Sequence, residues 1–229
     1  MNITQYFMGN SYPGRIIAAG LNHKGQLVYA YAIMGRSTNS RNRVFELNNG
    51  ELKTKAYDEA LVKDPSLIIY PAILKTSDKI IVANGDQSLN IKKALEKGLS
   101  IKEGIAERTF EPDEPNFTPR ISLVIRNEWD CASGCTKVLD FAINRRNEDG
   151  SCERKVWTYN AEPGKLYIIH TYEKDGNPLP SFVGKPRVLE LDNEDFAPIM
   201  WNSLDKDNRI SLYVKEGEKE TLFNAREGE

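Results

Sequence analysis

Residues 15–34, RIIAAGLNHKGQLVYAYAIM, carry the clearest structural pattern in the chain. Residues 15–19 form a short apolar run that ends at Gly20, and residues 26–34 form a second, longer run. The NHKG segment between them, residues 22–25, has the composition of a tight turn. The pattern therefore predicts a β-hairpin near the start of the chain.

Strand patterns outnumber helix patterns over the rest of the chain. Helical spacing before Gly98 and a capping box of Ser100 and Glu103 predict two helices, and Asp192 or Asn193 is expected to cap a third that runs to about Leu204. Further strands are predicted at residues 67–74, 79–83, 120–125, 136–144, 154–160, 165–172 and 209–214. Clustered strands with few helices favour an α+β fold in which two antiparallel sheets pack face to face with helices outside.

Composition limits the classes of function. The 229 residues include 31 Lys plus Arg against 33 Asp plus Glu, and the net charge of -2 provides no global field for nucleic acid, although local arginines suffice to bind a small anion. The longest apolar run, residues 67–74, is too short to span a membrane. The N-terminus lacks the pattern of a signal peptide, which favours the cytoplasm. Without a low-complexity linker or a repeat, one domain over residues 1–229 is expected, and the sequence leaves open whether it forms a homo-oligomer.

The cysteines and histidines give little sign of a metal site. Cys131 and Cys135 are separated by three residues rather than the two typical of zinc or redox motifs, and Cys152 leaves an odd count that fits a reduced compartment. His23 and His170 stand at no metal-binding spacing. We therefore expect neither a metal nor a cofactor.

Two segments carry groups suited to chemistry. The segment GRSTNSRNR, residues 35–43, combines Arg36, Arg41 and Arg43 with hydroxyl and amide groups that bind phosphate, although a solvated polar loop has the same composition. The proline-rich loop FEPDEPNFTPR, residues 110–120, offers carboxylates for proton transfer, but an acidic surface loop reads the same way.

Two shorter features have the same ambiguity. Asn84-Gly85-Asp86 is typical of a tight turn, yet its glycine also permits a ligand to approach the backbone closely. Tyr70 interrupts an apolar run, and it fits either the core or a position with its hydroxyl directed into a site.

Taken in order, these segments resemble the IMP cyclohydrolases of the archaeal type and their bacterial relatives. Each motif alone is weak, but the order and spacing over residues 12 to about 186 make the set specific. The matching pieces are YPGR at 12–15, Arg36-Ser37 through Arg41, Tyr70, ANG at 83–85, Glu111, Asn116 with TPR at 118–120, residues 167–172, and GNPLPSF at 176–182.

The resemblance implies a four-layer αββα sandwich like that of the N-terminal-nucleophile hydrolases. It does not imply their chemistry, which needs a Cys, Ser or Thr at the mature N-terminus, whereas this chain starts with Met1-Asn2-Ile3. The family reaction is the reversible dehydrating closure of 5-formamidoimidazole-4-carboxamide ribonucleotide to IMP.

The resemblance also implies the residues of the site. Arg41, Tyr70 and Glu111 match family residues of the reaction centre. Glu111 is expected to transfer protons, Tyr70 to donate or relay through its hydroxyl, and Arg41 to stabilise developing negative charge or orient the base. Seven further residues are expected to bind the purine nucleotide or shape its site: Arg15, Arg36, Asn84, Gly85, Asn116, Thr118 and Arg120.

Two other functions stay open on the sequence. The first is a non-catalytic protein that binds a purine nucleotide on the same scaffold. The second is an amide hydrolase of the N-terminal-nucleophile kind, which an intact Met1 in the mature protein would argue against.

Overall fold

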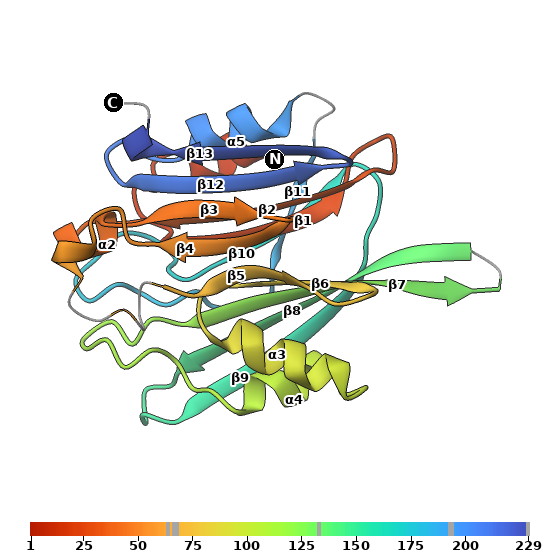
Figure 1. Ribbon diagram of the computed structural model, residues 1–229, viewed down its shortest axis with the longest axis horizontal. Coiled ribbons are helices and arrows are strands. Elements are labelled where there is room, and N and C mark those ends of the chain that lie inside the picture. The colour runs from red at the N-terminus through yellow and green to blue at the C-terminus, as the bar shows by residue number, and fades with distance from the viewer. Residues whose placement is uncertain (63–64, 66–68, 132–133, 192–194, 228–229) are drawn as a thin grey trace.

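The structure is a computed structural model of the chain, and it describes residues 1–62, 65, 69–131, 134–191 and 195–227. The described strands form two sheets in which neighbours are antiparallel (Figure 1). The six-stranded sheet contains, in spatial order, β11 (Arg187–Glu190), β10 (Lys165–His170), β1 (Arg15–Leu21), β2 (Leu27–Met34), β12 (Arg209–Glu216) and β13 (Lys219–Asn224). The seven-stranded sheet contains β3 (Val44–Asn48), β4 (Glu51–Lys55), β5 (Pro71–Lys75), β6 (Lys79–Ala83), β7 (Arg120–Asp130), β8 (Gly134–Arg146) and β9 (Cys152–Asn160).

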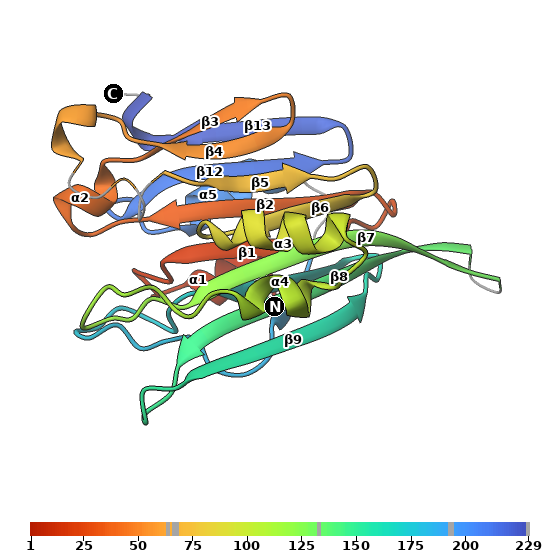
Figure 2. The same ribbon diagram turned by 60° about the horizontal axis from the view of Figure 1, so that its bottom comes forward.

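Helices cover the outer faces of both sheets, as Figures 1 and 2 show. Helices α1 (Ile3–Phe7) and α5 (Phe196–Ser203) share an apolar cluster with the outer face of the six-stranded sheet. Helices α3 (Gln87–Glu96) and α4 (Ile101–Ala106) pack in the same way on the seven-stranded sheet. A third cluster, the largest, lies between the two sheets. The predicted α+β class with two facing antiparallel sheets is therefore confirmed.

The alternation of side chains along β1 and β2 explains why both strands are apolar throughout. On β1, Ile17 and Ala19 face the other sheet, whereas Ile16 and Ala18 face the helices. Successive side chains of a strand point to opposite faces, and here both faces are covered. The predicted hairpin is confirmed, with a register that pairs Leu21 with Leu27.

Local signals also located a helix start and a turn. Ser100 accepts a hydrogen bond from the backbone nitrogen of Lys102, while its own backbone nitrogen donates to Glu103, so the predicted capping box begins α4. The Asn49-Gly50 pair, a typical turn sequence, joins β3 to β4, and both residues have positive φ.

The strand predicted at residues 67–74 starts later than expected. Residues 67 and 68 lie outside the described part of the chain, and β5 begins at Pro71. The backbone nitrogen of Tyr70 donates to the Thr54 hydroxyl, and its carbonyl accepts from that hydroxyl and from the Thr54 backbone nitrogen. Tyr70 therefore bonds partly to a side chain, and Pro71 has no N–H for a ladder.

Several strands carried too little apolar signal to be predicted, namely β3, β4, β11 and β13. They lie at or next to sheet edges, where one face is exposed and charged residues alternate with apolar ones. Strands β7 and β8 are longer than predicted, because their polar ends pair with each other and project from the body as a ribbon (Figure 1).

The last helix begins at a different residue than expected. Asp192 and Asn193 lie outside the described residues, and α5 has Asp195 at its N-cap. No helix in the described residues is long and apolar enough to cross a membrane.

Candidate functional site

A pocket of about 310 Å³ opens where β1 begins and both β2 and β10 end. Its volume lies at the lower end of the roughly 300–1,000 Å³ that is usual for small-molecule sites. Antiparallel pairing places these strand ends at one edge of the sheet, so the segments that adjoin them meet there. The lining residues are Tyr12, Arg15, Arg36, Ser37, Asn39, Ser40, Arg43, Glu111, Asp113, Asn116, Tyr172 and Leu179.

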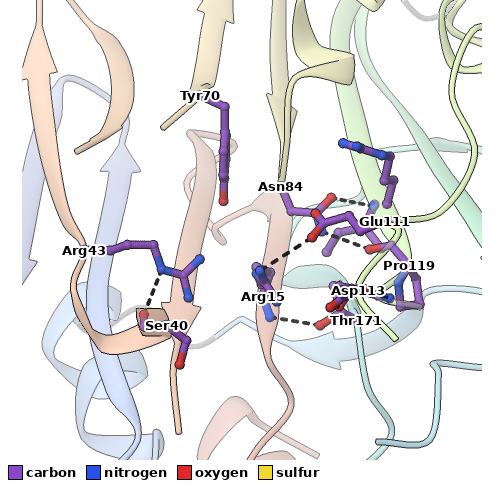
Figure 3. A network of polar contacts seen from close by, with 12 residues as sticks. Arg15, Ser40, Arg43, Tyr70, Asn84, Glu111, Asp113, Pro119 and Thr171 are labelled. Carbon is purple, nitrogen blue, oxygen red and sulfur yellow. Dashed lines mark hydrogen bonds and ion pairs between the residues drawn. The ribbon is translucent and has the colours of Figure 1, made fainter. Parts of the chain in front are cut away.

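Gly14 delivers Arg15 into this pocket. Its φ is +82°, and a Cβ at this position would lie 2.2 Å from Thr171 Oγ1 and 2.6 Å from a ring carbon of Tyr172. The close approach allows the Arg15 backbone nitrogen to donate to Thr171 Oγ1 at 3.1 Å (Figure 3). Only glycine satisfies both the backbone conformation and the space.

Replacing Gly14 with Ala is therefore expected to destabilise the protein by about 3 kcal/mol, which combines roughly 1–2 kcal/mol for left-handed backbone with 1–3 kcal/mol for overpacking. Gly9→Ala is the matched control, because Gly9 has φ +76° but nothing within 4 Å of an added Cβ. Gly9→Ala should lose only the roughly 1–2 kcal/mol of stability that comes from the left-handed backbone. Urea unfolding measures both, and equal losses would show that contact with Thr171 is unimportant.

Arg15 and Glu111 form a buried ion pair. Arg15 Nη2 lies 3.8 Å from Glu111 Oε2, and the Glu111 side chain is 5% exposed. At this separation the charges attract without a hydrogen bond, and no described residue donates one to the carboxylate. Burial raises the pKa of the Glu111 carboxyl above its ordinary value, and the positive charge of Arg15 opposes that rise. The carboxyl thus borders the pocket with one cationic neighbour and without a hydrogen-bond donor among the described residues.

Arg43 lies across the pocket from this pair. The residue is 1% exposed, its Nε donates to the Ser40 carbonyl at 2.8 Å, and its Nη2 donates to the Met34 carbonyl at 3.3 Å. No carboxylate of the described residues forms an ion pair with it. Burial, together with the positive charge of Arg15, lowers the pKa of Arg43. Two buried guanidinium groups against one buried carboxylate leave an excess of positive charge that suits an anion.

Tyr70 lies behind the pocket wall. It is buried, and its hydroxyl is 2.8 Å from the Tyr31 hydroxyl. In Figure 3 its ring extends toward the space between the guanidinium groups of Arg43 and Arg15. The Tyr70 hydroxyl therefore points toward the region between the two positively charged side chains.

The outer part of the pocket is aromatic and cationic. The Arg36 guanidinium lies 4.8 Å from the centre of the Tyr12 ring, and Tyr12 stacks on Tyr172. Arg36 also pairs with Asp175 and donates to the Gly176 carbonyl at 3.1 Å. The arrangement places the Arg36 cation over the face of the Tyr12 ring at the outer part of the pocket.

Two loops are fastened together on the opposite side. The backbone nitrogen of Thr118 donates to Asp113 Oδ1 at 2.6 Å, and the Thr118 hydroxyl contacts both Asp113 and Tyr172. Asn116 Oδ1 accepts from the Leu179 backbone nitrogen at 3.0 Å. Residues 111–118 therefore hold the 172–179 loop against the pocket.

His170 supports this region from beneath. Its Nδ1 lies 2.7 Å from the Tyr172 carbonyl, which only accepts, so Nδ1 carries the proton and Nε2 accepts from the Tyr6 hydroxyl at 2.6 Å. Burial lowers the pKa of His170 to about 4. The ring is therefore neutral in the folded protein.

We expect the neutral ring to make stability depend on pH. The unfolded chain protonates this histidine near pH 6.5, so the stability is complete above that pH and is lost as pH falls toward 4. The loss should amount to roughly 3 kcal/mol at 1.36 kcal/mol per pKa unit. Urea unfolding of the parent and of His170→Gln between pH 7 and pH 4 measures it, and parallel curves for the two proteins would contradict the assignment.

The chain is similar to known proteins over most of its length. A family model described as IMP cyclohydrolase-like protein matches residues 12–221. The chain is 29% identical over 179 residues to the IMP cyclohydrolase of Methanopyrus kandleri, an alignment that covers 75% of this chain and 89% of that protein. It is 28% identical over 170 residues to the IMP cyclohydrolase of Methanothrix thermoacetophila, covering 72% and 76% respectively.

The chain belongs to the IMP cyclohydrolase-like protein family. The resemblance inferred from the sequence is thereby confirmed. The family match spans all the residues that line the pocket.

The structure brings only some of the residues suggested by the family resemblance to the pocket. Arg15, Arg36, Glu111 and Asn116 line it, and Thr118 contacts two lining residues. Arg41 does not line it. Its guanidinium donates to the backbone carbonyl of Asp207.

Asn84, Gly85 and Arg120 form a separate network beside the pocket and do not line it. Asn84 donates to the Pro119 carbonyl at 2.9 Å and accepts from the Ile121 backbone nitrogen at 2.8 Å, which uses both ends of its amide. Arg120 pairs with Asp86, and a Cβ on Gly85 would lie 2.4 Å from the Arg120 guanidinium. In this structure their contacts connect β6 to β7 rather than face the pocket.

Arg43, Asp113 and Tyr172 line the pocket but were not among the candidate site residues. Arg43 lies in the same polar segment as Arg41, and only burial distinguishes the two. Asp113 lies in the acidic loop already noted, and Tyr172 lies in a segment that carried the family resemblance. Within the described residues, no cluster of three His, Cys, Asp or Glu side chains could hold a metal.

Proposed function

We propose that this chain is an IMP cyclohydrolase, which closes 5-formamidoimidazole-4-carboxamide ribonucleotide to IMP with loss of water, reversibly. The observation that carries the proposal is the buried Glu111 carboxyl beside Arg15, with Arg43 facing them, in the pocket of a member of this family. These groups suit a reaction that needs proton transfer and stabilisation of a transient negative charge.

The chemistry of the closure explains why so few groups suffice. The carboxamide nitrogen attacks the formyl carbon, and both groups are attached to one imidazole ring. Such intramolecular reactions reach effective molarities of roughly 10⁵–10⁸ M. The enzyme must hold the reactive rotamer, stabilise the tetrahedral oxyanion and move protons.

Each of these tasks has a candidate in the inner pocket. We assign to Glu111 the proton that the formyl oxygen gains as the ring closes, because burial raises the pKa of its carboxyl and lets it take up a proton more readily than an exposed glutamate. Arg15 and Arg43 stabilise the negative charge on that oxygen, and the Tyr70 hydroxyl, which is hydrogen-bonded to Tyr31 behind the pocket wall, is the hydroxyl donor or relay. We assign to Arg43 the charge-stabilising role that the family resemblance suggested for Arg41, because Arg43 lines the pocket and Arg41 does not.

The outer pocket suits the rest of the nucleotide. We place the 5′-phosphate near Arg36 and the hydroxyl-rich segment that follows it, where Ser37, Asn39 and Ser40 also line the pocket. Asn39 Oδ1 is buried without a hydrogen-bond partner, so it remains available to a ligand donor such as a ribose hydroxyl. Tyr12 and Tyr172 supply aromatic surface.

The layered arrangement of helices and sheets supports the finer fold expected from the resemblance. We propose that it is an αββα sandwich of the N-terminal-nucleophile hydrolase type, formed by residues 1–229 as one domain, whose site works without an N-terminal nucleophile. We also propose that the protein acts in the cytoplasm.

The direct test mixes purified protein with the formamido ribonucleotide and follows the ultraviolet absorbance change as the purine ring forms. We expect saturable closure, and hydrolysis of IMP in the reverse direction. Saturable IMP binding without closure would instead identify a non-catalytic nucleotide-binding protein, and absence of both would refute the proposal.

A further inference from the structure

We infer that Tyr172, Thr118 and Asp113 form a hydrogen-bonded relay of fixed direction, through which Tyr172 accepts a proton from the substrate's carboxamide nitrogen. The inference rests on the proposed function and adds to Glu111, the proton donor, a second route by which a proton leaves the substrate.

The relay runs from the pocket into the protein and back to its wall. Tyr172 lines the pocket, and its hydroxyl is within hydrogen-bond distance of the Thr118 hydroxyl. Thr118 is fully buried, and its hydroxyl also contacts Asp113 Oδ2. The other oxygen of Asp113 accepts from the Thr118 backbone nitrogen at 2.6 Å. One residue therefore supplies hydrogen bonds to both carboxylate oxygens.

Counting hydrogens sets the direction. Both oxygens of Asp113 accept, and an ionised carboxylate has no proton to give. The single proton of the Thr118 hydroxyl therefore goes to Asp113, and the Thr118 oxygen must accept from Tyr172. The Tyr172 proton thus points away from the pocket, and its oxygen presents lone pairs to a ligand.

A ligand that matches this oxygen carries an N–H at its edge. The carboxamide of the proposed substrate and N1 of IMP both do. When the bond between the carboxamide nitrogen and the formyl carbon forms, that nitrogen gives a proton to Tyr172, Tyr172 gives its own to Thr118, and Thr118 gives its own to Asp113.

The protons balance over the whole reaction. During ring closure Glu111 protonates the formyl oxygen, which becomes a hydroxyl group. In the dehydration that follows, the former formamido nitrogen returns a proton to Glu111. The proton held by Asp113 returns through Thr118 and Tyr172 and leaves with the hydroxyl as water, which restores the starting direction of the relay. Within the relay, Tyr172 is therefore the residue that acts on the substrate, whereas Thr118 and Asp113 act through it.

Asp113→Asn reverses the relay without changing its shape. The new amide nitrogen donates to Thr118, so the Thr118 proton turns to Tyr172 and the Tyr172 proton turns into the pocket. We expect kcat to fall by about 10²-fold, the lower range for general acid–base groups. Thr118→Val should lower kcat to a similar extent. Thr118→Ser, which keeps the hydroxyl, should have a kcat within about threefold of the parent.

A binding measurement tests the direction apart from turnover. IMP carries a proton on N1, whereas N1 of AMP only accepts. The parent should bind IMP more tightly than AMP. Asp113→Asn should reduce the ratio of the AMP dissociation constant to the IMP dissociation constant by about tenfold or more, because the Tyr172 hydroxyl then donates into the pocket. Isothermal titration gives both constants.

The outcomes separate the two proposals. An unchanged IMP-to-AMP ratio in Asp113→Asn, or equal losses of kcat in Thr118→Val and Thr118→Ser, would overturn the relay and leave a loop-fastening role. A parent that does not close the ring would overturn the proposed function, while the ratio still decides the direction of the relay. A parent that binds neither nucleotide would overturn both.

Discussion

Glu111→Gln should lower kcat for ring closure by about 10²–10⁴-fold and leave the dissociation constant for IMP within about threefold of the parent value. Glutamine has nearly the same shape, but its amide cannot give and regain a proton. The carboxyl is 5% exposed and lies 3.8 Å from Arg15, so water is poorly placed to replace it. Rapid-mixing absorbance gives kcat, and equilibrium titration gives the dissociation constant.

The same loop offers a matched control. Glu114 is exposed and does not line the pocket, so Glu114→Gln should leave kcat within about twofold.

Burial raises the pKa of Glu111, so its protonated form persists to higher pH than that of an ordinary glutamate. We expect kcat to fall as pH rises through that pKa. A fully active Glu111→Gln would remove Glu111 from the mechanism.

Arg43→Met should lower kcat by about 10²–10³-fold, the usual effect of removing one group that stabilises an oxyanion. Arg43 is 1% exposed and has donors left over after its two hydrogen bonds to backbone carbonyls. Arg43 lines the pocket, where negative charge develops in the proposed reaction. Methionine fills a similar volume without charge.

Stability should move in the opposite direction. Burial and the nearby positive charge of Arg15 disfavour the Arg43 cation, as its lowered pKa shows, so the methionine variant should unfold at the same temperature or higher. Arg41→Met is the control, two positions away in the same segment, and should keep kcat within about threefold. If Arg41→Met were the more damaging change, the family position of Arg41 would prevail over the pocket geometry.

Much of the fold followed from local patterns. The β1–β2 hairpin and the Ser100–Glu103 capping box are encoded by neighbours in sequence, and such signals survive folding unchanged. The late start of β5 could not be read locally. It depends on the Thr54 hydroxyl, which is sixteen residues from Tyr70 in the chain and replaces a ladder bond.

For the site, too, some features follow from local sequence and others from long-range packing. Residue type and order showed which chemical groups are available: a carboxylate in a proline-rich loop, three arginines in one polar segment, and the ordered motifs that place the chain in its family. Residue type and spacing carry that information. Tertiary structure alone decided that Arg43 rather than Arg41 lines the pocket, and that Asn84 and Arg120 bind their own protein beside it. Burial and hydrogen-bond partners arise where segments distant in sequence meet. They therefore determine whether a polar group bonds to its own protein or stays available to a ligand.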